Sequence, residues 1–197
     1  AVKFIEAQED KPFFLYLSQH AVHTPIQAKP ELVDKYKART PDGGHDNPTY
    51  AAMIESVDQS VGRVLDTLDR LNLSRNTVVV FFSDNGGYAN ATSMEPLRGS
   101  KGMLYEGGIR VPAVVRWPGV TQAGRKCDVP IIGIDFYPTF LEIADIRRPS
   151  GYTLDGESLV PLLRGGSALE REAIFWHFPA YLEPYNERQW PWRITPS

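Results

Sequence analysis

The sequence predicts an α/β fold with a mostly parallel sheet flanked by helices, and three observations support this prediction. Segments with the pattern of buried strands alternate with segments of helical period along the 197 residues. Most of the connections between them are short, which is typical of parallel sheets with right-handed crossovers. The hydrophobic fraction of 42% and the charged fraction of 23% are ordinary for one globular domain or a large part of one.

The first half of the chain contains two strand patterns and two helix patterns. Residues 11–18 (KPFFLYLS) predict a strand that is closed by a polar loop, and residues 30–37 predict a short helix. From Thr49 a long helix is expected, because apolar residues recur at i, i+3, i+4 and i+7 and form a stripe that would face a sheet. Residues 77–82 hold four β-branched and two aromatic residues, which suits a strand buried on both faces.

The second half begins with a long loop over residues 89–108, and loops of about 15 residues or more inside compact domains are usually functional. The elements expected after it are a strand over 111–117, a short strand over 131–134, a helix over 136–144 capped by Asp135, and a short helix around 158–163. The residues after Pro179 show no convincing periodicity.

Charge and composition exclude several classes of partner. The net charge of −3 and the pI near 5.8 give no electrostatic basis for binding nucleic acid or an anionic membrane. No apolar stretch approaches the roughly 20 residues that span a bilayer. The single Cys127 excludes an internal disulfide and a multi-cysteine zinc site. The sequence leaves the oligomeric state open.

The segment S-D-N-G-G directly follows the strand expected over 77–82. In parallel sheets, functional residues gather where strands end at their carboxyl ends. Asp84 would supply a carboxylate and Asn85 an amide oxygen, which are hard donors suited to Ca²⁺ or Mg²⁺, and the two glycines would allow a sharp turn. The same residue types are also the commonest in turns. By itself the segment allows both a metal half-site and an ordinary turn.

Three segments in this order resemble type I sulfatases of the alkaline phosphatase superfamily: KPFFLYLSQHAVHTP, TVVVFFSDNGG and LRGSKGMLYEGGIRVPAVVRWPG. The likeness extends from about Lys3 to Trp176 and is strongest to arylsulfatase-like enzymes that act on sulfated sugars. It implies the fold of that superfamily and a sulfuric ester hydrolase with a sulfated carbohydrate as substrate.

The resemblance also implies roles for individual residues. Asp84 and Asn85 match two ligands of a single Ca²⁺ that also binds the sulfate group. Lys101 matches the lysine that contacts a sulfate oxygen and the bridging oxygen, where a compact cation neutralises charge on the leaving group. His23, in an H-T-P segment, matches the proton donor to the leaving group. An imidazole suits this role, because this type of side chain titrates near neutral pH.

Other conspicuous residues have less specific interpretations. His177 lies among aromatic residues, which suits either a substrate pocket for sugar rings or simple packing. His20 is expected to be a loop-end or substrate-contacting residue without a catalytic duty. Glu106 and Arg110 are expected to form an ion pair that holds the base of the Lys101 loop.

The chain also departs from the family pattern. It has no C-x-P-S-R or C-x-A-x-R motif, from which the formylglycine nucleophile is made, and Cys127 fits neither. The nucleophile and the remaining Ca²⁺ carboxylates are therefore expected in a segment before Ala1. Residues 1–165 would be the second half of the catalytic domain and residues 166–197 the start of a truncated C-terminal subdomain. Such a fragment is expected to be inactive alone.

Two alternatives remain open at this point. A phosphodiesterase or phosphonate hydrolase of the same superfamily is disfavoured because two-metal phosphatases tend to need a histidine where Asn85 stands. A non-catalytic, sulfatase-like binding protein is disfavoured by the joint presence of His23, Asp84, Asn85 and Lys101. Family members are mostly exported or lysosomal, so a periplasmic, extracellular or lysosomal location is expected although no leader opens this chain.

Overall fold

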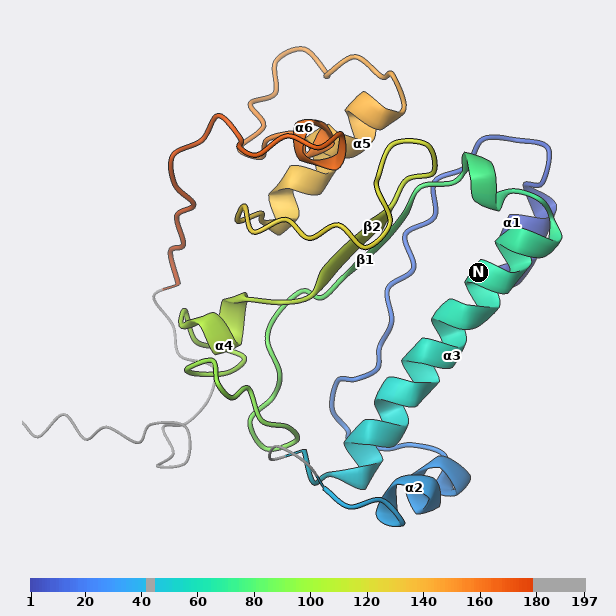
Figure 1. The fold of residues 1–197 in the computed structure, drawn as a ribbon, viewed down its shortest axis with the longest axis vertical. Helices are drawn as coiled ribbons and strands as arrows, with labels where there is room; N and C mark the ends of the chain where they lie inside the picture. The colour runs from blue at the N-terminus through green and yellow to red at the C-terminus, as the bar shows by residue number, and fades with distance from the viewer. Residues whose placement is uncertain (42–44, 179–197) are drawn as a thin grey trace, which may run out of the picture. The chain divides into compact units, whose positions relative to one another are not determined.

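The computed structural model describes residues 1–41 and 45–178 (Figure 1). These residues form helices and one small sheet, which makes an incomplete α/β fold. They divide into two compact units. Among the described residues, the first contains Ala1–Thr77 and Asn85–Val111, and the second contains Val78–Asp84 and residues 112–178.

The first unit is built around one long helix (Figure 1). Its elements are α1 (Val2–Ala7), α2 (Pro30–Lys37), α3 (Pro48–Arg70), the 3₁₀ turn η1 (Ser74–Asn76) and α4 (Glu106–Ile109). The side chain of Asn47 accepts hydrogen bonds from the amides of Thr49 and Tyr50, and Pro48 occupies the first turn, so the start of α3 is capped.

Helix α3 packs against α1 and α2. Ile5, Met53 and Leu68 are buried in this packing, and burial of their apolar surface is what stabilises it. Ion pairs also join the helices, since Glu6 lies 2.7 Å from Arg70 and Lys35 lies 2.7 Å from Glu55. These pairs are partly exposed and add little stability on their own.

The second unit contains the sheet. Strand β1 (Val79–Phe82) pairs in antiparallel register with β2 (Ala113–Arg116), and Val80 lies opposite Val115. The turn η2 (Gly133–Asp135) leads into α5 (Phe136–Ile143), and α6 (Val160–Leu163) packs on α5. The rings of Phe82 and Phe136 meet edge to face with centroids 4.9 Å apart, which joins β1 to α5.

A buried ion pair ties three segments of the second unit together. Asp135 is fully buried, and its carboxylate accepts hydrogen bonds from the guanidinium of Arg171 and from the amides of Ile132 and Glu157. Arg171 also donates to the carbonyl of Pro130 at 2.9 Å. Asp135 is the N-cap residue of α5 as predicted, but its side chain makes no cap hydrogen bond to that helix and binds Arg171 instead.

The predicted α/β class and most of the predicted elements are confirmed, but several details differ. Residues 11–18 and 131–134 form no strand, although exposure alternates from Phe13 to Tyr16 as in a strand. A strand exists only through hydrogen bonds to a neighbouring strand, and no such ladder reaches these residues within the described part of the chain. The one described strand pair is antiparallel, and β1 is not buried on both faces as predicted, since Phe81 is 42% exposed. In the first unit, α3 packs against the helices α1 and α2 where a sheet was predicted.

The predicted domain boundary and the capacity of the helices to span a membrane concern the chain as a whole. The expected boundary between residues 165 and 166 stays a prediction, and residues 179–197 lie outside the described part of the chain. Across residues 1–41 and 45–178, no helix combines the length and apolarity needed to cross a membrane.

Candidate active site

The candidate residues lie on loops that follow regular elements. Asp84 comes two residues after β1 and is exposed, and its neighbour Asn85 is half-buried. Asn85, His23 and Lys101 belong to the first unit, whereas Asp84 closes a segment of the second. The contacts that surround Asn85 and Lys101 lie within the first unit.

Backbone hydrogen bonds join the segment after Asn85 to the loop that carries Lys101. The amide of Gly86 donates to the carbonyl of Gly108 at 2.9 Å, and the amide of Lys101 donates to the carbonyl of Gly87 at 2.9 Å. The loop itself is closed by a 2.7 Å bond from the amide of Gly107 to the carbonyl of Arg98. Lys101 is thus held beside the residues that follow Asn85 by groups that do not titrate.

Glycine is required for this contact because the backbones approach too closely for any side chain. A Cβ atom on Gly86 would lie 1.8 Å from the carbonyl oxygen of Gly107, and one on Gly107 would lie 2.1 Å from that of Gly99. Gly86 and Gly107 are buried, so there is no open space into which either could move. The sequence suggested that the glycines after Asn85 serve a sharp turn, but neither has a positive φ, and the structure assigns Gly86 a close backbone approach.

Side chains close the same loop from outside. The guanidinium carbon of Arg98 lies 4.0 Å from the centroid of the Tyr105 ring, within cation–π distance. The expected ion pair between Glu106 and Arg110 is confirmed, with a nitrogen–oxygen distance of 3.2 Å, and both side chains are exposed. The contact that spans the ends of the Lys101 loop is therefore the Arg98–Tyr105 pair, whereas the exposed Glu106–Arg110 pair is local to α4 and adds little stability.

His23 is exposed and has a defined orientation. Its Nδ1 lies 3.0 Å from the carbonyl oxygen of Thr24. The hydroxyl of Thr24 lies 3.3 Å from the same nitrogen and can donate or accept, so both tautomers of the ring fit these contacts. The ring of His20 lies 5.8 Å away, and the nearby Gln19 side chain donates to the hydroxyl of Ser60 on α3 at 3.0 Å.

Asp84 and Asn85 both carry side-chain oxygens, which are the kind of donor that calcium prefers. The side-chain nitrogen Nδ2 of Asn85 donates to the carbonyl of Gly86 at 2.9 Å, and its side-chain oxygen is the atom with the chemistry of a calcium ligand. Calcium takes six to eight oxygen ligands, and these two side chains supply only a few of them. Among the described residues, no cluster of three or more His, Cys, Asp or Glu side chains could hold a metal. The chemistry fits Ca²⁺, but the donor set is incomplete within this part of the chain.

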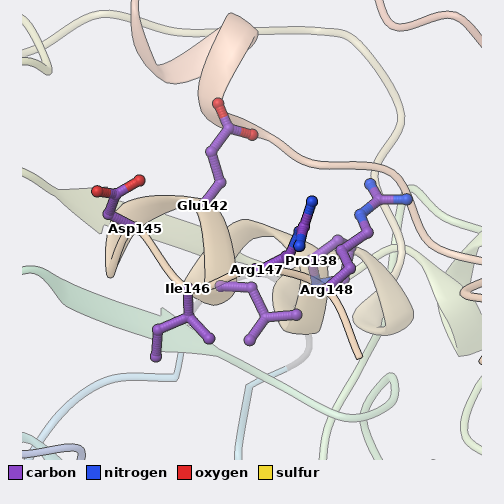
Figure 2. A pocket seen from close by; sticks show the side chains of 7 residues that line it. Pro138, Glu142, Asp145, Ile146, Arg147 and Arg148 are labelled. Atoms are coloured by element: carbon purple, nitrogen blue, oxygen red, sulfur yellow. The ribbon is translucent and has the colours of Figure 1, made fainter. Parts of the chain in front are cut away.

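His177 lies apart from any regular element. It is exposed, and its neighbours Phe175 and Trp176 are 88% and 45% exposed. A pocket in the second unit is lined by side chains from α5 and the residues after it, among them Glu142, Arg147 and Arg148, and Figure 2 shows these side chains. None of the candidate site residues lines it.

Sequence reasoning did not find two side-chain contacts, one in each unit. The Asp135–Arg171 pair joins residues 36 positions apart, a separation at which no local pattern operates. The Arg98–Tyr105 stack was also missed, although the strongly patterned loop over residues 89–108 was singled out as functional. The available signal was the glycine content of this loop, since Gly99 directly follows Arg98 and Gly107 comes two residues after Tyr105.

Comparisons with known proteins identify the family. A family model described as Sulfatase matches residues 1–146. A sulfatase from Formosa agariphila is 41% identical over an alignment that covers 93% of this chain and 36% of the relative, and human steryl-sulfatase is 34% identical over 92% of this chain and 31% of its own length.

A solved structure agrees with these relatives. Ps i-CgsB in complex with k-i-k-neocarrahexaose superposes with a TM-score of 0.75 at 38% identity, covering 81% of this chain and 36% of that one. The chain thus spans about a third of the length of the relatives that it matches. The matched family model covers most of the chain, and the chain belongs to the sulfatase family.

Proposed function

We propose that the protein containing this chain is a sulfatase, a sulfuric ester hydrolase that removes sulfate from sulfated carbohydrates. The observation that carries the proposal is the backbone lock of Gly86 and Gly87 with Lys101 and Gly108, which holds a cation beside the segment that begins with the candidate calcium ligands. The similar Ps i-CgsB was solved with k-i-k-neocarrahexaose, and this supports a carbohydrate as the substrate class.

Each residue has a chemical task in this proposal. The ammonium of Lys101 would neutralise the charge that builds on the bridging oxygen as the sulfur–oxygen bond breaks. His23 would donate a proton from its imidazole ring to that oxygen, so that the product leaves as an alcohol. Asp84 and Asn85 would bind Ca²⁺ through their side-chain oxygens. When bound, the Ca²⁺ would hold the sulfate group, and a formylglycine from outside this chain would supply the nucleophile.

Three further properties belong to the same proposal. His177 would contact the sugar from the edge of the site, which its exposure permits. The protein would be exported or lysosomal, as is common in its family. Residues 1–165 would be the second half of the catalytic domain, with the C-terminal subdomain starting at residue 166.

The experiment measures sulfate release by the full-length protein. Purified protein is given an aryl sulfate and a sulfated carrageenan oligosaccharide, and free sulfate is quantified with calcium present and after chelation. Sulfate release that stops on chelation and returns with Ca²⁺ is the expected result. Substituting Asp84→Ala should lower the rate by about 10- to 100-fold or more, because the calcium site loses one of its carboxylate ligands. Asp58→Ala on the exposed face of α3 is the matched control and should leave the rate unchanged.

Two results would overturn the proposal. Faster hydrolysis of phosphodiesters or phosphonate monoesters than of every sulfate ester would favour the related phosphoryl-transfer enzymes. Tight binding of sulfated oligosaccharide by a folded protein that releases no sulfate would favour a non-catalytic binding protein.

A further inference from the structure

The loop that carries Lys101 is closed by side chains to which the proposed reaction assigns no task. Arg98 begins the loop and Tyr105 ends it, and the guanidinium carbon lies 4.0 Å from the ring centroid. Gly99, with φ +79°, brings the first turn against the same ring, because a Cβ built on it would lie 3.0 Å from the Cβ of Tyr105. The side chain of Tyr105 therefore lies close to both the guanidinium of Arg98 and the turn at Gly99.

The backbone alone supports the middle of this loop at few points. The amide of Lys101 is bonded to the carbonyl of Gly87, and the amide of Met103 to the carbonyl of Ser100 at 3.1 Å. At the ends, the amide of Gly107 bonds to the carbonyl of Arg98. The Arg98–Tyr105 stack lies at these same ends, so it limits how far the two arms can separate and carry Lys101 away.

We propose that Arg98 and Tyr105 form a clasp that positions Lys101 against the leaving-group oxygen of the sulfate ester. The clasp is the cation–π pair of these two side chains, and both act through Lys101 without touching the reacting atoms. This inference rests on the proposed function of Lys101. The clasp would also affect which sulfate esters are hydrolysed well. A lysine that neutralises the leaving oxygen speeds the reaction most when that oxygen leaves as a strong base.

The test is a leaving-group series on the full-length protein. Aryl sulfates with phenols of graded acidity are hydrolysed by the wild type and by Arg98→Ala and Tyr105→Leu. For the least acidic phenol, kcat/KM should fall about 2- to 5-fold, the rate factor that corresponds to one exposed cation–π contact. For the most acidic phenol it should stay near the wild-type value, so the dependence on leaving-group acidity becomes steeper.

Conservative and matched variants separate positioning from general damage. Tyr105→Phe keeps the ring and should restore the wild-type dependence. The matched control is Arg39→Ala. Arg39 follows α2, and its guanidinium carbon lies 5.1 Å from the ring centroid of Tyr36 within that helix. This variant should leave kcat/KM unchanged for every aryl sulfate. An equal loss for every aryl sulfate in Arg98→Ala would overturn the clasp in favour of a purely structural role, and no loss would overturn it altogether.

A second measurement keeps the inference independent of catalysis. Hydrogen exchange of the Lys101 amide, which is bonded to Gly87, should be faster in Arg98→Ala than in the wild type and unchanged in Arg39→Ala. If the wild-type protein releases no sulfate, the proposed function fails, and the clasp is judged on this exchange rate. Unchanged exchange in Arg98→Ala would then overturn it.

Discussion

Two regions of the molecule hold distant parts of the chain together by opposite means. From Asn85 to Arg110 the contact is backbone to backbone, and glycines make it possible. Around Asp135 and Arg171 the contact is a buried ion pair between side chains. The first region cannot accept an added side chain, whereas the second cannot lose a charged one. The first is also indifferent to pH, because backbone groups do not titrate.

The pH response of the second region follows from the surroundings of Asp135. Burial opposes ionisation of its carboxyl, but hydrogen bonds from Arg171 and from the amides of Ile132 and Glu157 outweigh burial and hold its pKa below the ordinary value of 3.8. A carboxyl with a lowered pKa stabilises the folded state above its unfolded pKa. That contribution is lost as the pH falls through the lower, folded value.

The largest effect is expected from Asp135→Asn, which leaves the guanidinium of Arg171 without its carboxylate. Breaking a buried ion pair by removing one partner costs about 3–5 kcal/mol, and the lower end applies because the Arg171 side chain is 17% exposed. Native-state hydrogen exchange of the amides of Glu157 and Leu159 in the full-length protein measures the local free energy of opening.

The free-energy cost of Asp135→Asn should depend on pH. The difference in opening free energy between wild type and Asp135→Asn should be full above pH 3.8 and should narrow below it. Asp58→Asn, at an exposed position on α3, serves as the control and should show no such difference. A cost under about 1 kcal/mol, the worth of a surface ion pair, would show that the Asp135–Arg171 contact is not the buried clamp described above.

A smaller effect is expected from Gly86→Ala. The added Cβ would lie 1.8 Å from the Gly107 carbonyl oxygen, and overpacking of this kind costs about 1–3 kcal/mol. Gly62→Ala is the matched control, because a Cβ there meets nothing within 4 Å and the helix interior favours alanine by about 0.5–1 kcal/mol. In urea unfolding of the full-length protein, Gly86→Ala should lower the free energy of unfolding and Gly62→Ala should raise it. The loss in Gly86→Ala should be the same at neutral and at acid pH. A change of the same sign in both variants would contradict the backbone lock.

The comparison also shows which parts of the fold could be predicted from the sequence. The helix over 30–37 was found at its observed bounds, since its apolar residues and starting proline are local signals. The strand over 11–18 was not, because strand formation depends on a partner strand that a local pattern cannot supply.

The candidate site divides in the same way. Asp84, Asn85 and Lys101 stand out in the sequence as residue types with a chemistry, and the resemblance to sulfatases assigns them roles that stay predictions. The lock that brings Lys101 to Gly87 could not be foreseen, because it consists of amides and carbonyls that every sequence contains. The glycines marked the place of this contact but left its partner undetermined.

The central claim is that the side chain of Lys101, whose backbone the lock holds, acts on a sulfate ester, and Lys101→Ala in the full-length protein tests it most directly because alanine keeps the locked amide. The measurement is kcat/KM for sulfate ester hydrolysis together with the unfolding midpoint in urea, with the exposed Lys37→Ala as control. The predicted result is a loss of about 10²- to 10³-fold in kcat/KM with the unfolding midpoint unchanged. Hydrolysis by Lys101→Ala at the wild-type rate would contradict the claim.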